Sequence, residues 1–245
     1  MVHGLPDWGL RGPKSTTYGL DDLGEAVARL GSPVVWDRRG DVIRMESFGD
    51  GAGSYVTLLS GLGAAVHRTC GGAHTGAYGL ELIGGSTPNY YAYVSVNSPA
   101  PVLGPCGFEA WFGVAADTQA IDLQLVYLDG THQLEATLRY DHVAKTLALY
   151  TDGHVWAVID AALSLNTRLD PEHVAKVVAD FSTGYYERVI IDSLSYDVHT
   201  HLIDSLGFVS APYFWGRVRH ISTAGWNAAI IVDDLILTQN EPVSL

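Results

Sequence analysis

Two adjacent aspartates, Asp233 and Asp234, interrupt the otherwise apolar segment Ile230–Leu237 near the end of the chain. Short apolar runs rich in branched residues are typical of buried or half-buried strands. An unpaired buried charge is costly, so carboxylates in such a strand need a cation or hydrogen-bond donors. Neighbouring residues of a pleated strand face opposite sides. We therefore expect one carboxylate to point inward and the other to face solvent, unless both lie near an open strand end.

Aromatic residues form a second group that could bind a ligand. Tyr213, Phe214 and Trp215 follow a proline in an expected loop, and Trp226 is close by in the sequence. Most Tyr and Trp side chains of a β-sandwich lie in or near its core. An exposed aromatic cluster would mark a ligand site or a subunit contact. We predict that Tyr213, Phe214, Trp215 and Trp226 bind the ligand, although a second cluster shares one expected strand: Tyr90, Tyr91 and Tyr93.

The carboxylates that a glycosidase needs are not recognisable as a pair. Such enzymes use two carboxylates that flank the scissile bond, whereas Glu81, Glu109 and Glu135 each stand alone on an expected strand. The sequence contains no Glu-x-Asp-x-x-Glu run and no Gly-x-Ser-x-Gly nucleophile elbow. We predict no catalytic residues and interpret these glutamates as parts of solvated strand faces.

Metal-binding spacing occurs once, in Asp197-x-His199-x-His201. Alternate strand residues share a face, so this triplet could bind zinc with one further ligand. A solvated strand face beside a loop is the interpretation that we favour. Cys70 and Cys106 lack CxxC spacing, and we expect two buried free thiols while a disulfide stays open.

The composition is that of a globular protein without nucleic-acid or membrane partners. The chain has 245 residues, 47% of them hydrophobic and 17% charged, and its formal net charge is −13. So acidic a chain is poorly suited to nucleic acid or an anionic membrane as its main partner. We find no apolar signal-peptide core and no transmembrane run, which predicts synthesis in the cytoplasm without a membrane anchor. A leader that has been removed would leave the same pattern.

The elements predict an all-β fold: a two-sheet antiparallel jelly-roll sandwich with one short N-terminal helix and an extended N-terminal arm. Helical spacing with start and stop signals covers Asp21–Leu30. Short strands separated by turns fill the rest, with hairpin signals at Asp129-Gly130 and Asp152-Gly153. Asp170-Pro171-Glu172 predicts a single helical turn. We expect an arm-and-helix region, 1–40, and a sandwich domain, 41–245.

Three segments resemble the jelly-roll carbohydrate-binding modules of the concanavalin A-like and galactose-binding-like type: Met45–Gly51, His74–Leu82 and Val232–Leu237. A fourth, Val177–Arg188, is similar to the strand-turn-strand of laminin G-like sandwiches. The resemblance covers about residues 42–240 and implies that the first and last strands of the sandwich are neighbours. It therefore places Met45–Phe48 beside Val232–Leu235.

The same resemblance implies a structural calcium ion. Many of these modules hold calcium between their first and last strands, and calcium binds several carboxylate and carbonyl oxygens. Carried over to this sequence, the ligands would be Glu46, a backbone carbonyl near Thr75, and Asp233 or Asp234. Met45 departs from the pattern, because an aromatic residue usually precedes the glutamate.

Three short segments resemble the N-terminal part of some uncharacterised tailed-phage structural proteins: Leu5–Trp8, Ala28–Ser32 and Asp37–Ile43. The resemblance covers about residues 5–43. That resemblance implies a virion component that assembles with itself or with other virion subunits through its N-terminal arm. We therefore expect a non-catalytic structural protein of a larger particle, located in a virion. The alternative is a lectin-like carbohydrate-binding module that takes glycans as partners, and a more distant alternative is a glycan-active hydrolase.

Overall fold

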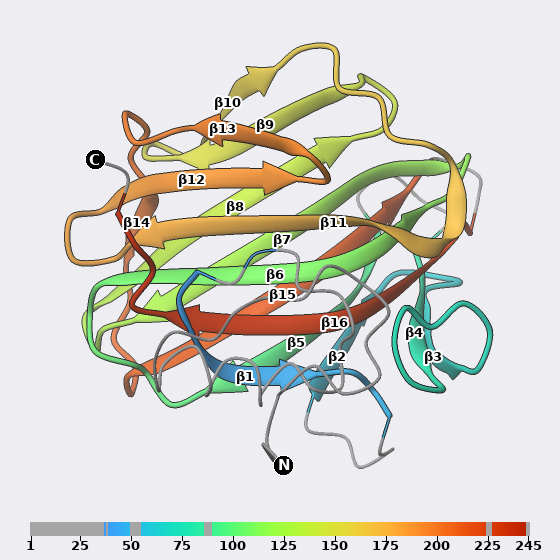
Figure 1. The fold of residues 1–245 in the computed structure, drawn as a ribbon, viewed down its shortest axis with the longest axis horizontal. Helices are drawn as coiled ribbons and strands as arrows, with labels where there is room; N and C mark the ends of the chain where they lie inside the picture. The colour runs from blue at the N-terminus through green and yellow to red at the C-terminus, as the bar shows by residue number, and fades with distance from the viewer. Residues whose placement is uncertain (1–36, 38, 50–54, 86–89, 224–226, 244–245) are drawn as a thin grey trace, which may run out of the picture.

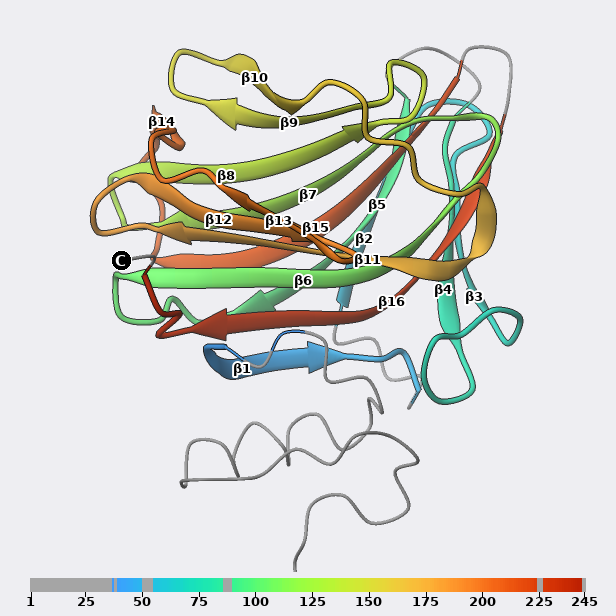
Figure 2. The same cartoon turned by 45° about the horizontal axis from the view of Figure 1, so that its top comes forward.

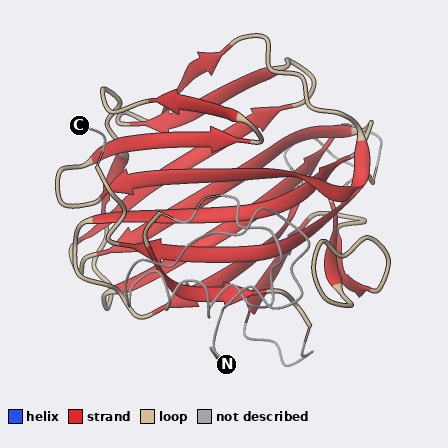
Figure 3. Ribbon diagram, viewed as in Figure 1, coloured by secondary structure: helices blue, strands red, loops and turns tan. Residues whose placement is uncertain are grey.

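The protein is a two-layer sandwich of antiparallel β-sheets, seen here in a computed structural model (Figures 1 and 3). The structure describes residues 37, 39–49, 55–85, 90–223 and 227–243. Each of the two sheets has eight strands. The described ranges contain no helix, and so no helix in them is long and apolar enough to cross a membrane. The predicted sandwich is confirmed, whereas the predicted helix at 21–30 lies outside the described residues.

Sheet A lies in front in Figure 1, and its order is β13-β12-β11-β6-β16-β4-β3, with β1 paired to β16. Its strands have these bounds: β1 Asp41–Glu46, β3 Ala65–Thr69, β4 Gly79–Ile83, β6 Pro105–Val114, β11 Arg168–Asp180, β12 Tyr185–Ile191, β13 Leu194–Asp197 and β16 Ala229–Gln239. Strand β1 pairs with the last strand, placing Met45 opposite Ile236 and Glu46 opposite Leu235. The predicted contact between the first and last strands of the sandwich is thus confirmed.

Sheet B lies behind sheet A, and its order is β10-β9-β8-β7-β15-β5-β2, with β14 paired to β8 (Figure 2). Its strands have these bounds: β2 Tyr55–Ser60, β5 Tyr91–Ser98, β7 Thr118–Leu128, β8 His132–Asp141, β9 Thr146–Thr151, β10 Val155–Asp160, β14 Asp204–Gly207 and β15 Tyr213–Ser222. Both predicted Asp-Gly hairpins are present, with Gly130 at φ 106° and Gly153 at φ 80°. Glycine adopts these positive values without the strain that a side chain would impose.

The core forms because apolar residues alternate along the strands and gather between the sheets. In β7, for example, Leu123, Leu125 and Tyr127 belong to the core cluster, whereas the intervening Asp122 and Gln124 do not. This period of two is the geometry of a pleated strand. It sends every second residue of β7, β8 and β15 to the outer face of sheet B.

The sheets approach closely where β15 crosses β6. A Cβ atom on Gly216 would lie 2.3 Å from the ring of Phe108, so only glycine fits there without repacking. On either side of Gly216, Phe214 and Val218 are completely buried in the core. Their neighbours Trp215 and Arg217 consequently face outward from sheet B.

Two local predictions are wrong. Asp170-Pro171-Glu172 lies within strand β11 and makes no helical turn, because β11 continues from Arg168 through Asp180 along β6. Tyr213–Trp215 is the beginning of strand β15 and is not a loop. In both places, pairing with neighbouring strands decides the conformation, and the local sequence signals do not.

Candidate functional site

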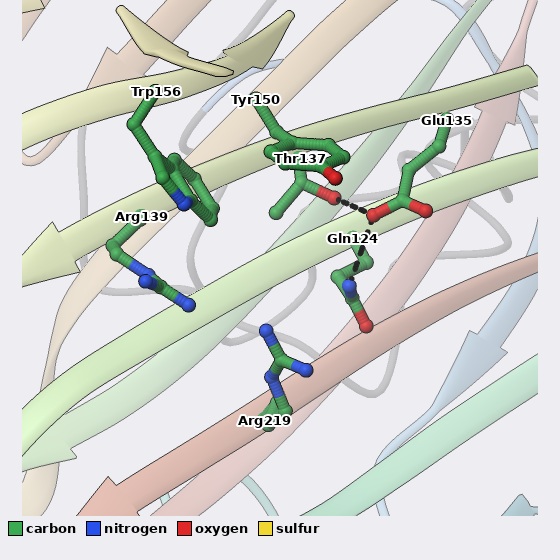
Figure 4. Close-up of a pocket in the computed structure, with 7 residues that line it drawn as sticks. All are labelled: Gln124, Glu135, Thr137, Arg139, Tyr150, Trp156 and Arg219. Atoms are coloured by element: carbon green, nitrogen blue, oxygen red, sulfur yellow. Dashed lines mark hydrogen bonds between the residues drawn. The ribbon is translucent and has the colours of Figure 1, made fainter. Parts of the chain in front are cut away.

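The outer face of sheet B carries a pocket between polar and aromatic side chains. Its volume is about 360 Å³. Five strands contribute to it, β7, β8, β9, β10 and β15, so no short stretch of sequence contains the site. The lining residues, drawn in Figure 4, are Gln124, Glu135, Thr137, Arg139, Tyr150, Trp156 and Arg219.

Asp122 lies beneath this pocket and fixes two of its arginines. Arg139 donates from Nε to Oδ1 at 2.7 Å and from Nη2 to Oδ2 at 2.8 Å, and Arg219 donates from Nε to Oδ2 at 2.9 Å. The Asp122 side chain is completely buried, while the two arginines keep about a quarter of their side-chain surface. Burial alone would lower the pKa of Arg139, but hydrogen bonds and attraction from Asp122 raise it overall. Asp122 therefore positions two charged guanidinium groups and is itself out of reach of a ligand.

Aromatic rings flank the arginines. The Arg139 guanidinium carbon lies 4.0 Å from the Trp156 ring centre, and Trp156 packs against Tyr150 with their ring centres 5.0 Å apart. Arg219 lies 5.4 Å from the ring centre of Tyr91. Such cation–π contacts orient the guanidinium groups. Trp156 is 36% exposed, which gives the pocket one accessible aromatic wall.

Arg217 extends the group of arginines along β15. Its guanidinium carbon lies 3.9 Å from the Tyr93 ring centre and 4.1 Å from that of Trp215. Its Nη1 donates to Gln124 Oε1 at 3.2 Å. Burial lowers the pKa of Arg217, and the charge on Arg219 acts in the same direction. We call Arg139, Arg217 and Arg219 the arginine strip.

Glu135 is the one carboxylate among the described residues that line the pocket. Its Oε1 accepts hydrogen bonds from Gln124 Nε2 at 3.1 Å and from Thr137 Oγ1 at 2.7 Å. Burial raises the pKa of Tyr150, and Asp204 and Glu135 add to this shift, so its hydroxyl keeps its proton. The pocket thus offers fixed donors and acceptors together with an aromatic surface.

The predicted calcium ligands come together only in part. The amide groups of His74 and Thr75 donate to Asp233 Oδ2 at 2.9 and 3.0 Å. Thr75 Oγ1 donates to Asp234 Oδ1 at 2.7 Å, and His74 Nδ1 lies 2.7 Å from Asp234 Oδ2. Both carboxylates therefore meet the same loop and are completely buried, so the prediction that they face opposite sides is wrong.

A β-bulge explains this shared orientation. Asp234 has φ 46°, and the pairing of β16 with β6 shifts register between Asp233 and Ile236. A bulge of this kind redirects side chains from the regular alternation. Burial, with repulsion from Asp234, raises the pKa of Asp233 to about 7 although three backbone amides donate to it.

This arrangement does not fit calcium. Calcium takes six to eight oxygen ligands, but both oxygens of each aspartate already accept or contact protein donors, including the Asp234 amide on Asp233 Oδ1. Glu46 Oε1 accepts the Phe48 amide at 3.0 Å. Across the described ranges, no group of three or more His, Cys, Asp or Glu side chains could hold a metal ion. Calcium stays a prediction that these contacts do not support.

The predicted aromatic site is divided between core and surface. Phe214 is completely buried and packs against Tyr127 and Phe181, so it cannot contact a ligand. Tyr213 is 37% exposed, and Trp215 faces outward beside Arg217. Trp226 lies outside the described residues.

The remaining candidates lie apart from each other. Three glutamates were each expected alone on a strand. Glu81 and Glu109 belong to sheet A, and only Glu135 lines the pocket. Asp197 and His199 contact each other on an exposed surface. Cys70 and Cys106 are both free, but Cys70 is exposed and so departs from the prediction of two buried thiols.

Sequence reasoning missed most of the pocket. Trp215, Arg217 and Arg219 alternate along one strand, and this spacing places them on one face. The same is true of Tyr91 and Tyr93. These signals could have indicated a polar, aromatic sheet face, but the link to Asp122 on β7 appears only with the strand order.

The sequence matches no protein-family profile and no curated protein. Among solved structures, the chain is similar to the "Cellulose induced protein, Cip1", with TM-score 0.50 and 11% identity, covering 82% of this chain and 100% of that one. A sialidase follows with TM-score 0.43 and 11% identity, and 82% of this chain spans only 18% of that protein. A structure of carbohydrate-binding modules from the β-sandwich superfamily has TM-score 0.39 and 15% identity, with 79% and 60% covered. At 11% identity, the likeness to Cip1 shows a shared fold.

Proposed function

We propose that this domain is a non-catalytic carbohydrate-binding module whose ligand lies in the pocket on sheet B. The observation that carries the proposal is the pairing of an exposed aromatic wall with fixed polar groups. Trp156 can stack on the apolar face of a sugar ring, while Gln124, Thr137 and Glu135 can exchange hydrogen bonds with its hydroxyl groups. Pockets that recognise small ligands combine these two elements.

Binding suits this pocket better than hydrolysis. A glycosidase needs two reachable carboxylates on either side of the scissile bond. Of the two carboxylates at this site, Glu135 lines the pocket and Asp122 is buried under two arginines. The virion interpretation depends on an anchor in residues 1–40, of which the structure describes only 37, 39 and 40. The pocket therefore gives the carbohydrate-binding alternative its more direct support.

The test is glycan binding by the whole protein and by the variant Trp156→Ala. We expect the protein to bind an oligosaccharide in a panel of neutral and acidic glycans. W156A should weaken that binding by at least about tenfold, which corresponds to ~1.4 kcal/mol, because it removes the stacking surface. Isothermal titration calorimetry measures the loss.

Tyr185→Ala is the matched control, since Tyr185 is 39% exposed on β12 of the other sheet. Y185A should bind as the original protein does, and both variants should keep its melting temperature within a few degrees. Equal losses in the two variants, or no glycan bound by the original protein, would refute the proposal.

A further inference from the structure

The arginine strip carries more positive charge than its surroundings neutralise. Arg139 and Arg219 share the single carboxylate of Asp122. Within the part of the chain that the structure describes, Arg217 forms no ion pair with a carboxylate, although Glu135 attracts its charge through space. Its near neighbours are the Gln124 amide and two aromatic rings. A local excess of cations is unexpected in a chain whose formal net charge is −13. This face of sheet B is therefore suited to an anion.

Neighbouring aromatic rings restrain the Arg217 side chain before any anion binds. Tyr93 and Trp215 both pack against its guanidinium, whose carbon lies 3.9 and 4.1 Å from their ring centres. Its Nε atom is buried and has no hydrogen-bond partner among the described residues. Because the rings already restrict its side chain, Arg217 loses little further freedom when it binds an anion.

We infer that the ligand of this module is an acidic saccharide, whose carboxylate or sulfate groups lie on the arginine strip. This inference rests on the proposed carbohydrate-binding function and adds the chemical class of the sugar. Guanidinium groups bind carboxylates and other oxyanions through paired N–H donors, and these charge-assisted hydrogen bonds are among the stronger ones in proteins. The positive charge of the arginine strip would also attract an acidic saccharide to a protein whose net negative charge otherwise repels it.

The pocket separates the anion from the one carboxylate that would repel it. Figure 4 shows Arg139 and Arg219 on the side of the pocket away from Glu135. Glu135 accepts hydrogen bonds from Gln124 and Thr137 and can accept further ones from sugar hydroxyls. An acidic sugar thus fits in one direction, with its anionic group towards the arginines and its hydroxyl groups towards Glu135.

The test compares three hexasaccharides of matched length by calorimetry: hexagalacturonate with carboxylates, a heparin fragment with sulfates, and neutral cellohexaose. We expect one or both acidic chains to bind at least about tenfold more tightly than the neutral chain. Their binding should weaken as salt is added, because salt screens charges at this partly exposed site. The first two chains tell carboxylate recognition from sulfate recognition.

Arg217→Gln identifies the residue responsible. R217Q should weaken binding of the preferred acidic chain by about tenfold or more, since a charge-assisted bond is lost. Arg217→Lys should recover only part of this loss, because lysine keeps the charge but lacks the planar fork. Arg168→Gln is the control, since it removes one charge from an exposed ion pair on sheet A and should change nothing.

The possible failures are distinct. The inference would be overturned if cellohexaose bound as tightly as both acidic chains, or more tightly. The proposed function would still stand if W156A abolished the binding of cellohexaose. The inference would also be overturned if R168Q and R217Q lost equal affinity for the preferred acidic saccharide. If none of the three chains binds, the inference fails, and the proposed function fails with it only if no glycan of the wider panel binds either. If R217Q folds poorly, the effect of salt on the affinity of the original protein for the acidic saccharides still tests the inference.

Discussion

Single carboxylates have different roles in this protein according to their partners. Asp122 is buried against two guanidinium groups, whereas Asp233 is buried beside another carboxylate. The second arrangement favours the protonated form of Asp233. It therefore makes folding depend on pH.

The pH dependence of stability tests this description. A carboxyl group whose folded pKa is raised from 3.8 to about 7 contributes stability that is complete below its unfolded pKa and is lost as pH rises through 7. In the presence of EDTA, we expect the free energy of unfolding to fall as pH is raised from 3.8 to about 7, and to level off above that. The fall from this group is at most ~1.4 kcal/mol per pH unit. Urea titrations at a series of pH values measure it.

Calcium supplies the corresponding control. Because the carboxylate oxygens of Asp233 and Asp234 already accept or contact protein donors, adding calcium should shift the melting temperature by less than about one degree. A stabilisation of ~1 kcal/mol would shift a domain of this size by about 2–4 °C. A rise of several degrees, together with loss of the pH dependence, would restore the calcium site that the sequence resemblance implies.

At the level of elements, a buried charge network joins the segment before β1 and the segment after β16 to sheet A. Lys176 on β11 is completely buried, with its Nζ 2.9 Å from Asp37 Oδ2 and 2.8 Å from Glu241 Oε1. Arg188 on β12 also contacts Glu241. These bonds hold both ends of the described chain against the same two strands.

Lys176→Met should destabilise the fold by about 3–5 kcal/mol, because it leaves Asp37 and Glu241 as buried charges without their main partner. Equilibrium unfolding in urea measures the change. Arg168→Gln breaks an exposed ion pair with Glu172 and should cost less than about 1 kcal/mol. Similar small losses in the two variants would show that the network contributes little.

Some of the strands and turns could be predicted from the sequence, and others could not. Most strands and both Asp-Gly hairpins could be predicted, because their signals are local. The bulge at Asp234 could not, since only the register between β16 and β6 creates it. The predicted helical turn at Asp170 failed for a similar reason, because β6 pairs with β11 on both sides of the proline, at Arg168 and from His173 onward.

At the level of the whole molecule, the sandwich was predictable and the site was not. Alternating apolar residues and the resemblance of Glu46 and Asp233 to first-strand and last-strand motifs indicated the closed two-sheet body. The pocket, by contrast, needs the order β10-β9-β8-β7-β15, which brings Trp156 and Arg219 to one face. Strand order depends on long-range pairing, and the spacing of residues along one strand does not contain it.

Tryptophan signals offer the most direct test of the claim that a sugar binds on the outer face of sheet B. The chain has six tryptophans, whose indole N–H groups give separate NMR signals. Trp156 and Trp215 lie on this face, whereas Trp111 belongs to sheet A and stacks on His74 with ring centres 3.6 Å apart. Substitution of each tryptophan assigns its signal.

Titration with hexagalacturonate and with cellohexaose should move the Trp156 and Trp215 signals along saturable curves with at least one of the two sugars, and leave the Trp111 signal in place. The account is contradicted if bound sugar moves the Trp111 signal while the signals of Trp156 and Trp215 stay where they are.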